Sequence, residues 1–185
     1  MFKLVRPIID AEHASSVILK QFMAGLIRKR PSATPVEARL IFVPYWIGAA
    51  AVRVNAAFAG RTVERSFACD AWHGVAGFVD GELPNEASED EHPPNGSVHC
   101  RVTREAAVES IARYASRLNQ GRLRTASLLA DRLELGLVYK PYWAVRLSTA
   151  DGGDLWRLVG ADDASVAHRF DGSIQEMLSS IDPTI

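Results

Sequence analysis

The sequence has few of the features that identify a secreted or membrane protein. Its 185 residues include two cysteines, Cys69 and Cys100, too few for a disulfide framework. No segment approaches the roughly 20 uninterrupted apolar residues that span a bilayer. The N-terminal segment MFKLVRPIID has no apolar run of signal-peptide length. We therefore expect a soluble, cytoplasmic protein of a reducing compartment, without membrane insertion.

The chain also has no excess of charge and no familiar catalytic motif. Its 21 lysines and arginines nearly balance 22 aspartates and glutamates, for a formal net charge of −1. A dedicated nucleic-acid binder usually carries a basic excess that displaces counterions from phosphates, so we expect no nucleic-acid partner. Gly-x-Ser-x-Gly, a phosphate-binding loop and a paired-glycine dinucleotide fingerprint are all missing. We therefore expect no catalytic residues of these types and no cofactor.

What the chain does contain is a repeated pattern. Pro-Tyr-Trp begins at Pro44 and again at Pro141, and Ala-Val-Arg follows both times. Each copy lies after a segment of helical character, at 11–30 and 104–119, and before an Asp-Ala pair and an Asp-Gly pair. We predict an internal duplication of about 85–90 residues. The first repeat is placed at 1–83, an acidic, proline-rich linker at 84–100 and the second repeat at 101–185.

The spacing within the repeats suggests which residues are equivalent. Asp70 lies 26 residues after Pro44 (70 − 44), and Asp163 lies 22 residues after Pro141 (163 − 141). The difference is even, and strand side chains alternate faces with period two, so we match Asp70 with Asp163. On this alignment the second repeat lacks a glycine equivalent to Gly74.

Each repeat is expected to be a helix followed by a long antiparallel hairpin. Asp10 and Thr103 are candidate helix caps. The segment 133–148 alternates apolar and polar residues, as a strand with one solvated face does. A short helical piece is expected near 125–131. The predicted fold is α+β, with both helices packed on one face of a curved antiparallel sheet.

The first long strand is apolar on both faces, which predicts cover on both. That cover could come from the chain itself, from a ligand or from a partner protein. We therefore predict a binding surface for a protein partner or for self-association; no particular small-molecule ligand is indicated. The alternative is ordinary core packing of the aromatic pairs. The candidate binding residues are Ile41, Val43, Tyr45, Trp46, Ile47, Tyr142 and Trp143.

A weaker alternative is a small hydrolase or metal-dependent enzyme centred on Cys69, Asp70 and His73. Asp70 and His73 could act as an acid–base pair and Cys69 as a nucleophile. His99 and Cys100 would be needed to complete a zinc site, but adjacent residues rarely reach one ion, so we predict no metal. An aspartate at a strand end is more simply a turn former. We favour a noncatalytic protein.

Two segments resemble known bacterial modules. LIFVPYW and GRTVERSFACDAWHGVAGFVDGELP resemble a β-rich module that often follows a zinc ribbon, although no Cys-x-x-Cys pair precedes it here. LVYKPYWAVRL and LVGADDASVAHRFDG resemble PepSY-type units, which are built as a helix, a long strand, a turn and a second strand. The resemblance implies tandem α+β units and a noncatalytic adaptor or assembly role.

Overall fold

The chain divides into two compact units, and each unit contains segments from both halves of the sequence. The computed structural model describes residues 2–24, 33–56, 59–79, 88–90, 92–117, 125–128 and 133–181. Unit 1 comprises Met1–Lys3, Pro44–His92 and Cys100–Val138, and unit 2 comprises Leu4–Val43, Pro93–His99 and Tyr139–Ile185. These units differ from the sequence repeats 1–83 and 101–185, whose boundaries, like the linker at 84–100, stay a prediction.

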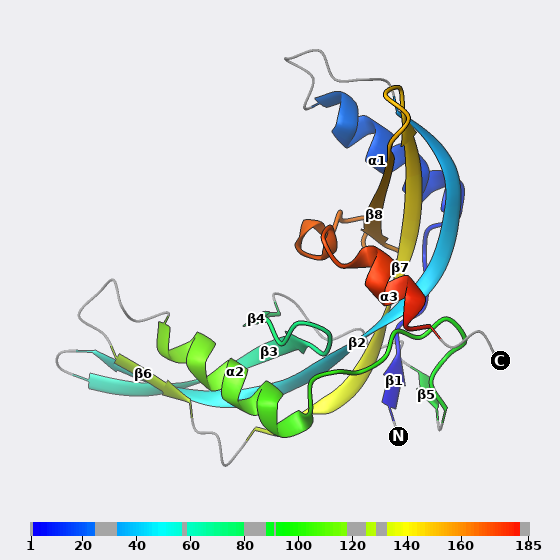
Figure 1. Cartoon of the computed structure of the whole chain (residues 1–185). Coiled ribbons are helices and arrows are strands. Elements are labelled where there is room, and N and C mark those ends of the chain that lie inside the picture. The colour runs from blue at the N-terminus through cyan, green and yellow to red at the C-terminus, as the bar shows by residue number, and fades with distance from the viewer. Residues whose placement is uncertain are drawn as a thin grey trace. The chain divides into compact units, whose positions relative to one another are not determined.

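The fold is α+β, as predicted, with helices packed on a sheet (Figure 1). The elements, in chain order, are β1 (Phe2–Leu4), α1 (Ala11–Ala24), β2 (Ala33–Ala56), β3 (Ala59–Asp70), β4 (Ala76–Phe78), β5 (Ser88–Asp90), α2 (Arg104–Arg117), β6 (Thr125–Leu128), β7 (Gly136–Thr149), β8 (Asp154–Gly160), the 3-10 helix η2 (His168–Phe170) and α3 (Ile174–Ser179). The strands are hydrogen-bonded in the order β4-β3-β2-β7-β1-β5, with β6 beside β2 and β8 beside β7. The expected helical piece near 125–131 is wrong where it is described, because Thr125–Leu128 pairs with β2 as a strand.

In unit 1, helix α2 covers one face of the β2–β3 hairpin (Figure 1). The hairpin is antiparallel, and its register places Tyr45 opposite Asp70. The buried helix positions are those predicted from the helical period: Ala107, Ile111 and Ala115. They pack against a strand face that includes Val52, Phe67 and Cys69. The predicted cap is also present, since the N–H of Ala106 donates to the Thr103 hydroxyl at 3.3 Å.

In unit 2, helix α1 covers one face of the β7–β8 hairpin in the same way. Ala14 and Ile18 of the helix pack against Val145, Leu147 and Val159 of the strands. The N–H of His13 donates to the Asp10 carboxylate at 2.8 Å, so the predicted cap is present here too. The predicted continuation of this helix to residue 30 lies outside the described residues after Ala24.

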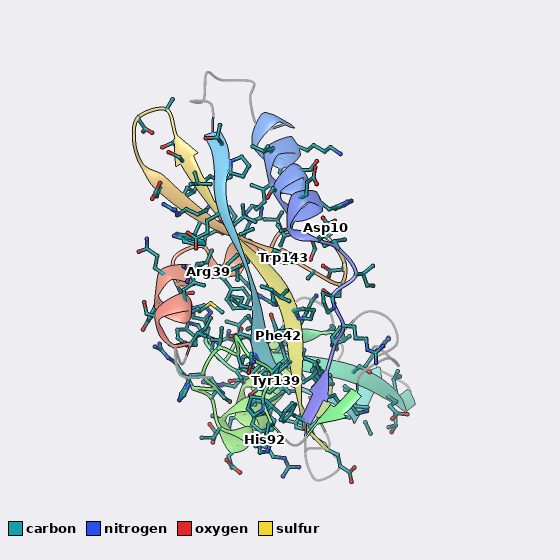
Figure 2. All side chains as sticks on the ribbon, turned by 90° about the vertical axis from the view of Figure 1, so that its right-hand side faces the viewer. Asp10, Arg39, Phe42, His92, Tyr139 and Trp143 are labelled. Atoms are coloured by element: carbon teal, nitrogen blue, oxygen red, sulfur yellow. The ribbon has the colours of Figure 1, made fainter. Side chains whose placement is uncertain are left out.

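The two halves of the sequence exchange their helices. Helix α1, from the first half, packs on the second hairpin, and α2, from the second half, packs on the first. The two tryptophans of the Pro-Tyr-Trp repeats show the exchange most directly. The indole N–H of Trp46 donates to the carbonyl of Val102 at 2.8 Å. The indole N–H of Trp143, which is labelled in Figure 2, donates to the carbonyl of Ile9 at 2.8 Å. Each acceptor lies two residues before the first residue of a helix.

The chain segments leading into the two helices are held by equivalent backbone bonds. The N–H of Ile9 donates to the carbonyl of Ala161 at 2.9 Å, and the N–H of Val102 donates to the carbonyl of Ala71 at 3.0 Å. Ala71 and Ala161 in turn donate to the carbonyls of the two repeated prolines, both at 2.9 Å. The duplicated sequence therefore folds into duplicated local structure, and the repeat in structure is as clear as the repeat in sequence.

The predicted match of Asp70 with Asp163 is wrong. Tyr45 pairs with Asp70, whereas the equivalent Tyr142 pairs with Gly160, so Asp70 corresponds to Gly160. These partners are separated by 25 residues (70 − 45) and 18 residues (160 − 142), an odd difference. Even spacing is not required, because residues directly opposite each other share a face whatever the length of the loop between them.

The two turns use an aspartate from different positions to satisfy the same backbone. Asp70 accepts the N–H groups of His73 (2.6 Å) and Val75 (3.2 Å). In the second turn Asp163 accepts the N–H of Ser165 at 2.9 Å. A Cβ on Gly160 would overlap the Asp163 carboxylate, so glycine at 160 leaves the room that this carboxylate fills. The sequence alignment matched the two aspartates because both accept N–H groups of the turn, although they occupy different positions in the two repeats.

The same turns give a prediction about stability. Gly74 and Ala164 are equivalent, since each N–H donates to the carbonyl four residues earlier, and their φ angles are 75° and 55°. Left-handed backbone costs an L-residue about 1–2 kcal/mol, partly offset by the greater entropy that glycine loses on folding. We expect Ala164→Gly to raise the free energy of unfolding by about 0.5–1 kcal/mol.

The reverse change in the first turn is the matched control. An added Cβ at Gly74 would meet its nearest atom, Cγ2 of Val102, at an ordinary 3.5 Å, so conformation rather than space decides the outcome. Gly74→Ala should therefore lower the free energy of unfolding by a similar amount in urea titrations. Destabilisation by Ala164→Gly would contradict the assignment of strain to this turn.

Candidate functional site

Most of the seven predicted binding residues are buried within the chain. Ile41, Val43, Tyr45 and Tyr142 are between 0% and 4% exposed, which is the core packing that the sequence left open as the alternative. Trp46, Trp143 and Ile47 are partly buried. The two tryptophans are held by the helix-leading segments described above, so they have a structural role in the fold. A binding role stays a prediction. Of the seven residues, Ile47 is the one that is partly exposed and has no such structural role described above.

The weaker alternative site is not assembled as a single centre. Cys69 lies in the core beneath α2, and burial together with the charge of Asp70 raises the pKa of its thiol to about 11. Cys69 is therefore a protonated thiol at neutral pH, which disfavours it as a nucleophile. Asp70 projects to the opposite face of the strand, with an oxygen 3.8 Å from Nδ1 of His73. Its two oxygens accept the turn N–H groups, which fits the turn-forming role.

The remaining members of the suggested metal set do not complete a site in the structure. Cys69 is buried and Cys100 is exposed, and both are free thiols. Across the described ranges, no group of three histidine, cysteine, aspartate or glutamate side chains is placed to hold a metal ion.

An ion cluster that sequence reasoning missed lies in unit 2. Nζ of Lys140 is 2.8 Å from Asp163 and 3.4 Å from Asp162. Burial raises the pKa of Asp162. Burial also acts to raise the pKa of Asp163, but hydrogen bonds from Lys140 and Ser165 outweigh it and lower that pKa. With the lysine paired to both carboxylates, the cluster ties the turn after β8 to β7 and is best explained as a structural contact.

The second hairpin is covered on both faces near the turn that follows β8. Its face opposite α1 carries Tyr142, Ala144 and Leu158, all 2% exposed or less. The ring of Tyr142 meets the edge of Phe170, with 6.1 Å between the ring centroids, and α3 packs beside β8. Helix α3 buries its apolar residues Ile174 and Met177. The sequence did not predict this short helix.

The equivalent face of the first hairpin is more open. It carries Ile47, Ala49 and Ala51 of β2 and Ala68 of β3, all partly exposed, and Gly77 of β4 pairs with Ala68 on the same face. A Cβ added to Gly77 would meet no atom within 4 Å. Helix α2 packs on the opposite face of this hairpin. We call these five residues the alanine face.

The sequence explains why the first hairpin differs. Because Asp70 corresponds to Gly160, residues 84–89 take the sequence position of α3. They read PNEASE, whereas α3 reads IQEMLS. Pro84 and Ala87 stand where Ile174 and Met177 supply the apolar contacts of α3. The first half thus lacks the apolar side chains with which the second half covers the same face.

None of the helices in the described part of the chain is both long and apolar enough to cross a membrane. Comparison with protein-family models, with curated proteins and with solved structures finds no match for this chain.

Proposed function

We propose that the protein is a noncatalytic protein-binding protein that holds an amphipathic helix of a partner on the alanine face. The observation that carries this proposal is internal to the chain: the η2–α3 segment covers the equivalent part of the second hairpin, with Phe170 of η2 against Tyr142 and α3 packed beside β8. The first hairpin has the same strands but not the apolar sequence that would cover them. An adaptor or assembly role in the bacterial cytoplasm, and a relationship to PepSY-type units, belong to the same proposal.

The chemistry of the face defines the partner. Small side chains at Ala49, Ala51 and Ala68 let a helix backbone approach the sheet closely, and Ile47 offers the larger apolar contact. The bound helix should carry apolar residues three positions apart, as Ile174 and Met177 are in α3. Glu64, opposite Ala51 at one end of the face, is exposed and favours a basic residue on the partner. Binding would rest on burial of apolar surface.

A peptide taken from the chain itself tests the proposal. A fluorescently labelled peptide of residues 167–181, which contains α3, is titrated with the whole protein, and anisotropy is measured. We expect saturable binding that Ile47→Arg weakens at least about tenfold, equivalent to about 1.4 kcal/mol. Ile47 corresponds to Ala144, which is fully buried in the second hairpin, so the arginine would stand where the helix packs. Ala150→Arg, which places an arginine at an exposed turn residue, should leave binding unchanged.

Three results would contradict the proposal. These are no saturable binding, equal binding of a scrambled peptide, and equal binding by the Ile47→Arg protein. Analytical ultracentrifugation of the free protein measures whether it is a monomer or a dimer, and so tests whether a second copy of the chain binds to the alanine face. A dimer that Ile47→Asp converts to a monomer would show that a second copy, and not a partner helix, covers the alanine face.

A further inference from the structure

A second open feature of unit 1 lies between α2 and β4. A cavity of about 430 Å³ is lined by Val75, Ala76, Ser110, Arg113, Tyr114 and Arg117, together with Gly74. Arg113 and Arg117 are one helical turn apart on α2, and both are exposed. Arg113 contacts the Ser110 hydroxyl at 3.2 Å. The cavity therefore presents two guanidinium groups on one wall and apolar side chains on the other.

Two large apolar side chains at the cavity are exposed to solvent: Val75, which lines it, and Phe78, whose ring contacts Tyr114 of the lining. Phe78 is 40% exposed and Val75 is 54% exposed, and they are among the few large apolar side chains so exposed in the described part of the chain. The ring of Phe78 is held between Phe67 and Tyr114, with centroid distances of 5.1 and 5.4 Å. The exposed surface of Phe78 thus belongs to a fixed ring and not to a freely rotating one.

Strand β4 also offers a free edge to which another strand can bind. It ends the strand order on this side and pairs with β3 alone among the described strands. The N–H of Val79 donates inward to the carbonyl of Ser66 at 3.1 Å. Because antiparallel ladders alternate, the N–H and C=O groups of Ala76 and Phe78 are directed away from β3, toward the open edge.

The equivalent place in unit 2 has different chemistry. Counting from the equivalent caps and turns, Arg117 corresponds to Ala24, Tyr114 to Gln21 and Phe78 to His168. The segment after the second turn leads into η2 rather than continuing as an edge strand. Within the described residues, only unit 1 therefore combines the two arginines, the rings of Phe78 and Tyr114 and the open edge of β4. The repeat itself does not require this combination.

We propose that β4 and the adjacent arginines bind an extended acidic peptide, which adds as a strand to the free edge of β4. Its backbone would pair with the outward groups of Ala76 and Phe78, as peptides do when they extend a sheet. Its side chains would alternate between the two faces of the sheet. Those on the α2 side would lie beside Phe78, whose ring contacts Tyr114 of α2, and the others, which are apolar, would project to the opposite face. Its carboxylates would reach Arg113 and Arg117, whose planar guanidinium groups suit two-point contact with carboxylates. The contacts with the arginines lie on the α2 side of the sheet, opposite to the alanine face.

The test uses a short capped peptide of alternating glutamate and valine, labelled with a fluorophore, and the whole protein. We expect saturable binding at near-physiological ionic strength, while a matched peptide of alternating lysine and valine does not bind. The double variant Arg113→Glu, Arg117→Glu should weaken binding at least about tenfold. Arg104→Glu makes the same charge change at the other end of α2 and should have little effect.

Two further variants test whether binding uses the backbone of β4 and whether it is independent of the alanine face. Ala76→Pro removes an outward N–H while leaving the β3–β4 bonds in place, so it should also weaken binding. Ile47→Arg, on the alanine face, should not. Circular dichroism and thermal unfolding of each variant establish that it is folded. Absence of binding, equal binding of the lysine peptide, insensitivity to the arginine variants, or displacement by millimolar succinate as readily as by unlabelled peptide would overturn the proposal.

Discussion

Gly48→Ala is expected to lower the free energy of unfolding by about 3 kcal/mol or more. A Cβ at this position would overlap the backbone carbonyl oxygen of Glu134 and lie 2.9 Å from its carbonyl carbon. The Cδ2 atom of Leu135 would be 3.1 Å away. The obstacle is mainly backbone, which cannot rotate aside as a long side chain can, so the strand or the segment 133–135 would have to move.

Gly77→Ala is the matched control for this prediction. Gly77 lies two strands from Gly48 in the same unit, and its added Cβ would meet nothing within 4 Å. Its effect should stay within about 0.5 kcal/mol. Urea titrations of both variants, followed by tryptophan fluorescence, measure the difference. A Gly48→Ala protein as stable as the Gly77→Ala protein would show that residues 133–135 do not approach β2 as described.

Gly48 also marks where the two copies of the repeat diverge. Counting from the equivalent tryptophans, Gly48 corresponds to Val145, which is buried beneath α1. In unit 1 that space is taken by the chain between α2 and β7, where Leu133 and Leu135 join the core around Ile111. The repeat thus keeps its backbone contacts while each copy fills its core with different side chains.

Features encoded by neighbouring residues could be predicted from the sequence. Asp10 and Thr103 cap their helices, and the period of α2 correctly selects Ala107, Ile111 and Ala115 as buried. These predictions succeed because caps and helical stripes depend on residues within a few positions of each other.

Partners distant in the sequence could not be predicted in the same way. An apolar stripe shows that a helix has a buried face but not which hairpin covers it. Ala14 and Ile18 of α1 have the same types and spacing as Ala107 and Ile111 of α2, so either helix suits either hairpin. Nothing in the local pattern distinguishes packing within a repeat from packing between repeats.

The sequence predicted only part of the candidate binding face. Alternation correctly placed Ile41, Val43, Tyr45 and Ile47 on one face of β2. It gave no information on cover, and the first three are buried while Ile47 is partly exposed. Residues 96–98 lie beside this part of β2 as a hydrogen-bonded neighbour, since Phe42 exchanges backbone hydrogen bonds with Gly96 and Val98, and Val98 is buried. The prolines and polar residues around this segment predict that it belongs to the linker.

The exchange of helices leads to a second prediction with a large effect. Fragments 1–91 and 92–185, produced separately, should each fail to fold, because each hairpin would lack the helix that covers it. Mixed in equal amounts, they should form one complex with the circular dichroism and cooperative unfolding of the intact chain. The contacts that would hold the complex include the buried face of α2 against Phe67 and the Trp46–Val102 hydrogen bond.

A variant fragment provides the control for complementation. Ile111 is fully buried against the first hairpin, so Ile111→Asp in fragment 92–185 should prevent the complex from forming. Glu109→Asp, at an exposed position on the same helix, should not. Cooperative unfolding of either fragment alone would contradict the exchange, since it would mean that a helix can cover the hairpin of its own repeat.

The exchanged helices are the arrangement expected if two copies of one unit were joined in a single chain. A single ancestral unit that could not cover its own hairpin would pair with a second copy by exchanging helices, a known route to symmetric dimers. Duplication within one chain would then join two partners that already depended on each other. Each copy would afterwards be free to change the residues that the exchange does not use. The alanine face and the β4 edge lie outside the exchanged contacts and differ between the copies, which makes them the surfaces on which a binding role could develop.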